Sequence, residues 1–188
     1  MITANAKSRG YYKIKGAADA FNFDFKNKVV LDIGSSTGGF TEYALERGAK
    51  QVIAIEKGTN QMKAPLRHDP RIELHEKTDI FATKLPHTPD VILADVSFIS
   101  LTQVLAYAKA HLADTHTEFL VMLKPQFEAE PKDLHQGIVK NEAIRRNLIK
   151  NFEHWLKAHH FVILKKRDNS LKGKTGNQER FYYLKLEK

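Results

Sequence analysis

Two charged side chains follow apolar runs in the middle of the sequence. Lys124 comes directly after the run 119–123 (FLVML), and Asp95 ends the run 90–95 (DVILAD). A buried ammonium group is rarely tolerated without a partner, so Asp95 is the natural partner of Lys124 if the two runs form neighbouring strands. Such a pair can be a supporting ion pair, or it can take part in proton transfer. These two residues alone leave both interpretations open.

A loop of small residues follows an earlier apolar run. Residues 32–40 (DIGSSTGGF) would let a ligand approach the backbone and would open a helix N-terminus. Glu56 ends the next apolar run, where a carboxylate can accept both ribose hydroxyls of an adenosine-type ligand. Ser36 stands where a dinucleotide-binding GxGxxG loop has its second glycine, so the loop favours a different nucleotide-like ligand.

Strands alternate with helices along the chain. We predict strands over 28–34, 51–56, 71–75, 90–95 and 119–123, helices over 40–47 and 101–111, a helix over 141–159, and a terminal hairpin of strands 161–164 and 181–186. This order predicts an α/β fold, a mostly parallel sheet with helices on both faces. Ligands of such sheets bind at the carboxyl ends of the strands, where the residues above would meet.

The positive charge is concentrated at the two ends of the sequence. The net charge of +8 divides into +4 for residues 1–28, −4 for 29–139 and +8 for 140–188. If both ends fold onto one face, that face would attract a polyanion. Solvated lysines on helix surfaces would explain the same charge equally well. On the helix 141–159 we place Arg145, Arg146, Lys150 and Lys157 largely off the apolar stripe.

Length and composition exclude several classes of protein. With 188 residues, 42% hydrophobic and 28% charged, the sequence predicts one compact folded unit. No apolar run approaches the roughly 20 residues of a membrane helix, and the first residues lack a signal peptide's apolar core. The absence of cysteine excludes disulfides and thiolate zinc sites and fits a cytoplasmic protein. Nine histidines form no HExxH pair, so neither a metal nor a membrane is expected as a partner.

Five motifs make the sequence resemble a known family. SRGYYK, LDIGSSTGGFT, DVSFISL, MLKPQFE and GNQE follow, in order and spacing, the hemolysin A or TlyA-type proteins. These are bacterial ribosomal-RNA 2′-O-methyltransferases with an FtsJ-like catalytic domain. The resemblance covers nearly all of the sequence. Members usually carry an S4 RNA-binding domain before the SRG motif, whereas only MITANAK precedes Ser8 here, so we expect a chain without that module.

The resemblance implies a class I, Rossmann-like methyltransferase that uses S-adenosylmethionine and releases S-adenosylhomocysteine. The expected organisation is a single FtsJ-like domain over 1–188, with an N-terminal segment 1–25 and a catalytic core 26–188. A seven-stranded, mostly parallel sheet would end in an antiparallel hairpin. The expected partner is ribosomal RNA or a ribosomal subunit.

The resemblance also implies residue roles. The family's catalytic Lys-Asp-Lys-Glu tetrad matches Lys13, Asp95, Lys124 and Glu179. The expected cofactor-binding residues are Asp32, Gly34, Ser35, Ser36, Gly38, Phe40, Glu56, Lys57, Asp79 and Asp95. The expected RNA-binding residues are Arg9, Lys13, Lys15, Arg145, Arg146, Lys172 and Lys174. Lys15 replaces an acidic residue that is common in the family.

Such a tetrad suits attack by a ribose hydroxyl on a sulfonium methyl, which needs alignment and removal of a weakly acidic proton. Lys124, if neutral, could take that proton, and Lys13 would hold the 2′-oxygen or a neighbouring phosphate. The carboxylates would orient the lysines. Without the resemblance, Lys13 and Glu179 would be interpreted as exposed surface charges.

Other functions fit the sequence less well. A dehydrogenase would have a GxGxxG loop, which this sequence lacks. An amino-methyltransferase would have an NPPY-like motif where this sequence has DVSF, and a C5 pyrimidine methyltransferase would need a cysteine. A membrane-damaging hemolysin would need a membrane-active segment, for which the helix 141–159 is the candidate; its narrow apolar stripe favours packing on the sheet. An RNA-binding module with a degenerate methyltransferase fold is the non-enzymatic alternative, against which the complete tetrad argues.

Overall fold

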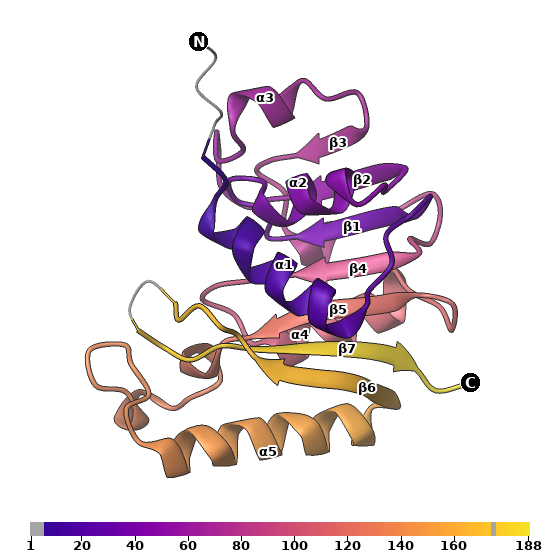
Figure 1. The fold of residues 1–188 in the computed structure, drawn as a ribbon. Coiled ribbons are helices and arrows are strands. Elements are labelled where there is room, and N and C mark those ends of the chain that lie inside the picture. Colours follow the sequence, from indigo (N-terminus) through magenta and orange to yellow (C-terminus); the bar gives the residue numbers. More distant parts are fainter. Residues whose placement is uncertain (1–5, 174–175) are drawn as a thin grey trace.

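The computed structural model describes residues 6–173 and 176–188, which form a seven-stranded sheet between helices (Figure 1). The strand order is β3-β2-β1-β4-β5-β7-β6. The strands are β1 (Val29–Ile33), β2 (Gln51–Ile55), β3 (Ile72–His75), β4 (Val91–Ala94), β5 (Glu118–Leu123), β6 (Phe161–Asp168) and β7 (Arg180–Leu186). β1 to β5 pair in parallel, and β7 runs antiparallel to β5 and β6. The predicted fold class, with its antiparallel terminal hairpin, is confirmed.

Helices cover both faces of the sheet. They are α1 (Arg9–Phe21), α2 (Gly39–Glu46), α3 (Ala64–Arg67), α4 (Leu101–His111) and α5 (Glu142–Ala158), with 3₁₀ turns at Ile80–Ala82, Pro125–Phe127 and Pro131–Asp133. α1 and α2 pack on one face, while α4 and α5 pack on the other. Among the described residues, no helix is long and apolar enough to cross a membrane.

The apolar runs are buried because the central strands have both faces covered. Side chains alternate along β5: Phe119 and Val121 join the cluster under α4 and α5, whereas Leu120 and Met122 join the cluster under α1 and α2. This alternation follows from the two-residue period of a strand. The strands are therefore fixed on both sides, and their carboxyl ends form a rigid edge.

The helix α1 was not predicted. Ser8 caps its N-terminus, where the Ser8 hydroxyl accepts a hydrogen bond from the Tyr11 amide at 3.2 Å. Ile14 and Phe21 are buried in the core, so the N-terminal segment packs on the sheet as an integral part of it. The buried positions 14, 17, 18 and 21 follow a helical spacing that the sequence interpretation overlooked, and two glycines within the helix lower its intrinsic propensity.

The N-termini of α1 and α2 touch through a glycine. A Cβ on Gly39 would lie 2.6 Å from the Tyr11 backbone nitrogen and would overlap the Ser8 hydroxyl. Only a residue without a side chain allows this crossing. The SRG motif and the glycine loop therefore lie in direct contact, although about thirty residues separate them in the sequence.

The helix α5 differs from the prediction at one residue. Phe152 and Leu156 are buried as expected, but Arg145 is also buried, with 8% exposure. Its guanidinium donates to Asp168 Oδ1 at 2.7 Å and to the Gln178 carbonyl at 3.3 Å. The expectation that Arg145 lies off the buried stripe is wrong, because the hairpin supplies partners for its charge.

Candidate functional site

The strand-end residues gather at one edge of the sheet, on the left of Figure 1. Two adjoining pockets of about 570 Å³ each open there, and they share Gly34, Ser36, Asp95, Ser97 and Phe98. One lies over the ends of β2 and β3, and we call it the β2–β3 pocket. The other lies between α1 and the end of β5, and we call it the α1–β5 pocket.

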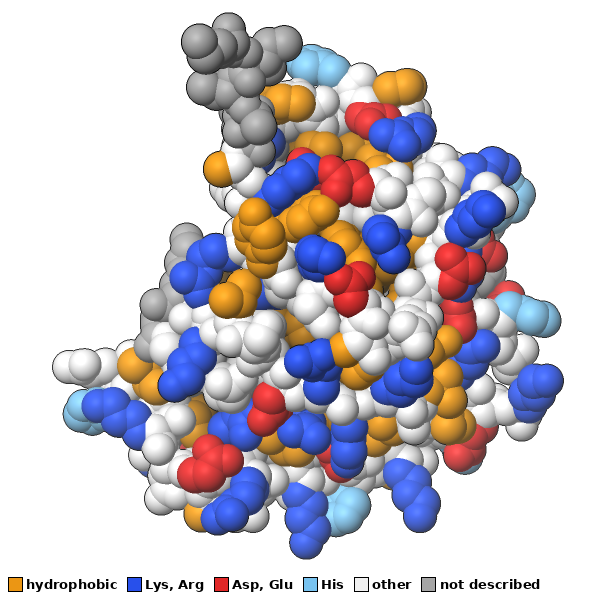
Figure 2. Space-filling view, in the orientation of Figure 1, with side chains coloured by type: hydrophobic (Ala, Val, Ile, Leu, Met, Phe, Trp, Pro, Cys, Tyr) orange, Lys and Arg blue, Asp and Glu red, His pale blue; other side chains and the backbone are white. Residues whose placement is uncertain are grey.

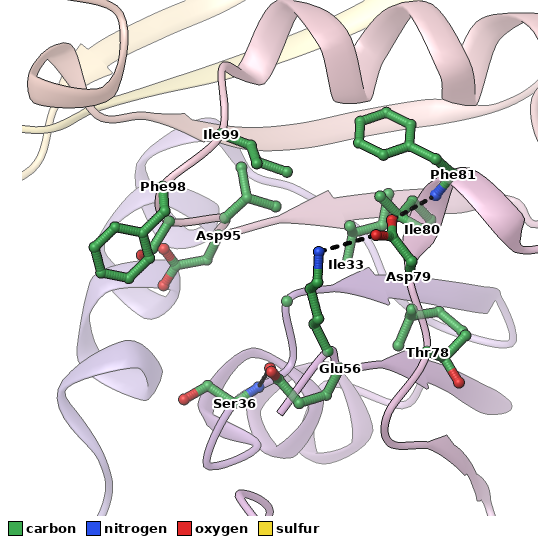
Figure 3. Close-up of a pocket in the computed structure, with 15 residues that line it drawn as sticks. Ile33, Ser36, Glu56, Thr78, Asp79, Ile80, Phe81, Asp95, Phe98 and Ile99 are labelled. Atoms are coloured by element: carbon green, nitrogen blue, oxygen red, sulfur yellow. Dashed lines mark hydrogen bonds and ion pairs between the residues drawn. The ribbon is translucent and has the colours of Figure 1, made fainter. Parts of the chain in front are cut away.

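Three carboxylates line the β2–β3 pocket, those of Glu56, Asp79 and Asp95 (Figure 3). Glu56 follows β2, and its oxygens accept hydrogen bonds from the Ser36 amide at 2.9 Å and the Gly58 amide at 2.6 Å. Asp79 follows β3, caps the next turn through the Phe81 amide at 3.0 Å, and pairs with Lys57 at 3.0 Å.

The rest of the β2–β3 pocket wall is largely apolar. Its apolar residues are Ile33, Ile55, Ile80, Phe81, Val96, Phe98 and Ile99. A flat apolar ring with a polar rim therefore suits the space between these side chains and the carboxylates of Glu56 and Asp79.

The glycine loop lies against the end of β4. Gly34 has a φ of +80°, and a Cβ there would lie 2.9 Å from the Asp95 carbonyl oxygen. The loop can therefore approach β4 only with glycine at this position. The neighbouring Ser35 hydroxyl is buried and has no hydrogen-bond partner among the described residues, so it can bond to a ligand atom that enters the pocket it lines.

A buried carboxyl group lies beneath this loop. Asp32 has no exposed surface. Its Oδ2 accepts a hydrogen bond from the Thr41 hydroxyl at 2.6 Å, while no residue in the described part of the chain donates to its Oδ1. Burial raises the pKa of Asp32 to about 7 despite the Thr41 hydrogen bond, and the nearby charge of Asp95 adds to the rise. A cation bound close by would favour the ionised carboxylate.

Two ion pairs line the α1–β5 pocket. Lys124 Nζ lies 2.6 Å from Asp95 Oδ1 and donates to the Ser97 hydroxyl at 2.9 Å. Lys13 Nζ lies 2.5 Å from Glu179 Oε2. All four side chains are at most 21% exposed. The fold thus brings the four predicted tetrad residues into one pocket from α1, the ends of β4 and β5, and the start of β7.

An aromatic ring that the sequence interpretation did not single out stands at the mouth of both pockets. Phe98 is 88% exposed and adopts a left-handed φ of +68°, which an aromatic residue rarely does. Its ring centroid lies 5.2 Å from that of Phe127. The signal that could have found it is a large aromatic residue in the loop directly after a strand.

The predicted RNA-binding residues do not form one cluster. Arg9 lines the α1–β5 pocket and donates to the Lys172 carbonyl, so α1 and the hairpin loop meet there. Lys15 pairs with Asp19 at 2.5 Å on the exposed side of α1. Arg146 lies on α5, which covers the opposite face of the sheet. Lys174 lies outside the described residues.

Lys and Arg side chains spread across the face that carries α1 (Figure 2). Arg145 is occupied within the protein, as described above. In the described part of the chain, no group of three or more His, Asp or Glu side chains is arranged to hold a metal ion.

The fold and the pockets define a class I methyltransferase architecture. The structure superposes on a Burkholderia thailandensis methyltransferase crystallised with S-adenosylhomocysteine, with a TM-score of 0.65, 19% identity and coverage of 99% of this chain and 80% of the other, a likeness of fold. The FtsJ-like methyltransferase family model matches residues 6–186. The chain belongs to this family, which confirms the resemblance of its motifs.

Two further proteins are similar over nearly the whole chain. A 23S rRNA (cytidine-2′-O)-methyltransferase of Campylobacter jejuni is 36% identical over 94% of this chain and 69% of its own length. The solved structure of a "putative hemolysin" from Lactococcus lactis has 31% identity and a TM-score of 0.92, covering 98% of this chain and 90% of that one. The chain spans about two thirds of the length of the curated relatives it matches.

Proposed function

We propose that this chain transfers a methyl group from S-adenosylmethionine to a ribose 2′-hydroxyl of ribosomal RNA. The observation that carries the proposal is the pair of shielded Lys–carboxylate contacts in a pocket that adjoins the largely apolar β2–β3 pocket with Glu56 and Asp79. The name of the Campylobacter relative, a 23S rRNA (cytidine-2′-O)-methyltransferase, supports the substrate class.

The residues of the β2–β3 pocket fit this cofactor. Glu56 would accept the ribose hydroxyls, and Asp79 would meet the adenine amine, with the ring between Ile55 and Ile80. The Ser35 hydroxyl, which lines the adjoining α1–β5 pocket, would bond to a polar group of the ligand, and the buried Asp32 carboxylate beneath the loop would stabilise a cationic group through its charge. Gly34, Ser36, Gly38, Phe40 and Lys57 belong to the same proposed site.

The tetrad would align the hydroxyl and manage its proton. When bound, the cofactor supplies an activated methyl group on sulfonium sulfur. Lys124, in its neutral form, would accept the proton of the 2′-hydroxyl, while Asp95 and Ser97 fix the direction of its amine. Lys13 would hold the 2′-oxygen or an adjacent phosphate, and Glu179 fixes the position of Lys13.

Phe98 would receive the base of the target nucleotide. Its exposed ring stands between the cofactor side and the tetrad side of the site, so a base stacked on it would place the attached ribose near Lys124. Stacking on an exposed aromatic ring is the usual way in which proteins hold an unpaired nucleotide. Arg9, Lys15 and Lys172 on the α1 side would contact neighbouring phosphates.

A calorimetric titration with S-adenosylmethionine, and separately with NAD, tests the cofactor. Binding of the first and not the second is expected, and absence of S-adenosylmethionine binding would contradict the proposal. Methyl transfer is then measured with radiolabelled cofactor on rRNA and on ribosomal subunits, followed by nucleoside analysis. The variant K124A should lose methyl transfer while binding the cofactor nearly as tightly as the wild type. Loss of cofactor binding in K124A would show that Lys124 is wrongly assigned.

A further inference from the structure

Glu128 joins the two loops that carry Asp95 and Lys124. It ends the short turn after β5, and its side chain reaches the first turn of α4. Its Oε2 accepts a hydrogen bond from the Ser100 hydroxyl at 2.6 Å, and its Oε1 accepts one from the Leu101 amide at 2.7 Å. Both carboxylate oxygens are therefore used on the segment that follows β4.

The negative charge suits this position. The first amides of a helix have no partner inside the helix, and they favour an anion. Ser100 caps α4 by accepting from the Thr102 amide, and its own hydroxyl donates to Glu128. The carboxylate thus completes the N-terminus of α4 from a different strand, through charge-assisted hydrogen bonds.

Three further contacts join the same two segments, 95–101 and 124–128. Lys124 meets Asp95 and Ser97, and the ring of Phe98 leans on that of Phe127. Phe98 itself has a left-handed backbone that persists only where the surroundings hold it. Glu128 fixes the C-terminal end of the segment 95–101, while Lys124 fixes its N-terminal end.

We propose that Glu128 is a positioning residue for the site. It holds the segment 95–101 against the turn after β5, and so keeps Phe98 at the pocket mouth and Asp95 in register with Lys124. The inference rests on the proposed function. Glu128 lines neither of the two pockets, and both of its oxygens accept hydrogen bonds from Ser100 and Leu101.

Three variants of the full chain test this role. E128A removes both acceptors, E128Q keeps one, and E130A is the matched control. Glu130 lies two residues away, is 69% exposed, and pairs with Lys132 at the surface. For each variant we would measure the S-adenosylmethionine Kd by calorimetry, kcat and KM for rRNA, and amide hydrogen exchange over residues 96–101.

The expected pattern separates positioning from simple stabilisation. E128A should lose about tenfold or more in kcat/KM, with a higher KM for rRNA because Phe98 is no longer held, while the cofactor Kd changes less than about threefold. E128Q should recover part of the loss, and E130A should behave as wild type. Exchange at the Leu101 amide should become faster in E128A only.

Several results would overturn the inference. The first is an E128A variant with the kcat and KM of the wild type. The second is an E128A variant with an unchanged KM whose kcat falls only in proportion to the fraction of protein that is unfolded. If the wild-type chain methylates no rRNA, the proposed function fails, but hydrogen exchange still decides about Glu128. Unchanged exchange over 96–101 in E128A would then reject the positioning role, and faster exchange would support it.

Discussion

Removing one partner of the ion pair between Lys13 and Glu179 should lower the free energy of unfolding far more than replacing both partners together. The two side chains are 10% and 3% exposed, and their charged atoms lie 2.5 Å apart. Removing one partner of a buried pair leaves an uncompensated charge and costs about 3–5 kcal/mol, whereas replacing both by apolar residues is often neutral or stabilising. Because the pair borders a pocket, we expect about 3 kcal/mol for each of K13M and E179M. The double variant K13M/E179M should lie within about 2 kcal/mol of the wild type, because it leaves no lone charge but removes the acceptor of the buried Asn169 side-chain amide at 3.3 Å.

Urea unfolding at neutral pH gives the four free energies of this double-mutant cycle. The control is K15M on the same helix. Lys15 pairs with Asp19 at the same 2.5 Å separation but is 48% exposed, so its loss should cost under about 0.5 kcal/mol. Additive effects of the two single substitutions would refute the reasoning, because they would mean that neither charge depends on the other. All three pair variants should lose methyl transfer, even where stability returns.

Three further predictions concern the base platform, the basic face and the buried carboxyl group. F98A should raise KM for rRNA about tenfold, as expected for one lost stacking contact, and F98Y should restore it; an unchanged KM in F98A would remove the ring from the site. If Arg9, Lys15 and Lys172 make about three phosphate contacts, the affinity for rRNA should fall roughly twentyfold between about 50 and about 200 mM salt. Filter binding measures this affinity, and an affinity that does not change with salt would contradict the basic face. The raised pKa of Asp32 means that its protonated form stabilises the fold, so this stability is present at low pH and is lost as pH rises through about 7. We would measure the free energy of unfolding in urea for the wild type and for D32N. Relative to D32N, the wild-type value should fall by up to about 4 kcal/mol between pH 4 and pH 8. If the two free energies change in parallel with pH, the pKa of Asp32 is not raised by folding.

Local sequence pattern was enough to predict the sheet and its polar edge. The central strands β4 and β5 are apolar runs that stop at the charged residues Asp95 and Lys124, and both properties can be read without tertiary information. The predicted partnership of these two residues is present in the structure at 2.6 Å. Family resemblance, rather than pattern, brought Lys13 and Glu179 into consideration.

Features that depend on distant partners could not be predicted in this way. The helical spacing of α1 could be read from the sequence, but the burial of Lys13 could not, because Lys13 tolerates burial only through Glu179, which reaches it from the hairpin. Arg145 is buried because Asp168 and the Gln178 carbonyl lie against it, more than twenty residues along the chain. The outward position of Phe98 follows from a backbone conformation that residue type does not indicate.

The place of β7 in the sheet has a consequence for synthesis of the chain. Residues 180–186 lie between β5 and β6, so these two strands cannot be bridged until the ribosome has made the last strand of the sheet. A nascent chain that has reached β6 would expose the apolar edge of β5, and such an edge is prone to pair with other chains. Lys13 is synthesised early, and its ion-pair partner Glu179 would still be absent at that stage. We expect folding to be limited by this late, long-range strand insertion, and catalytic competence to appear together with it.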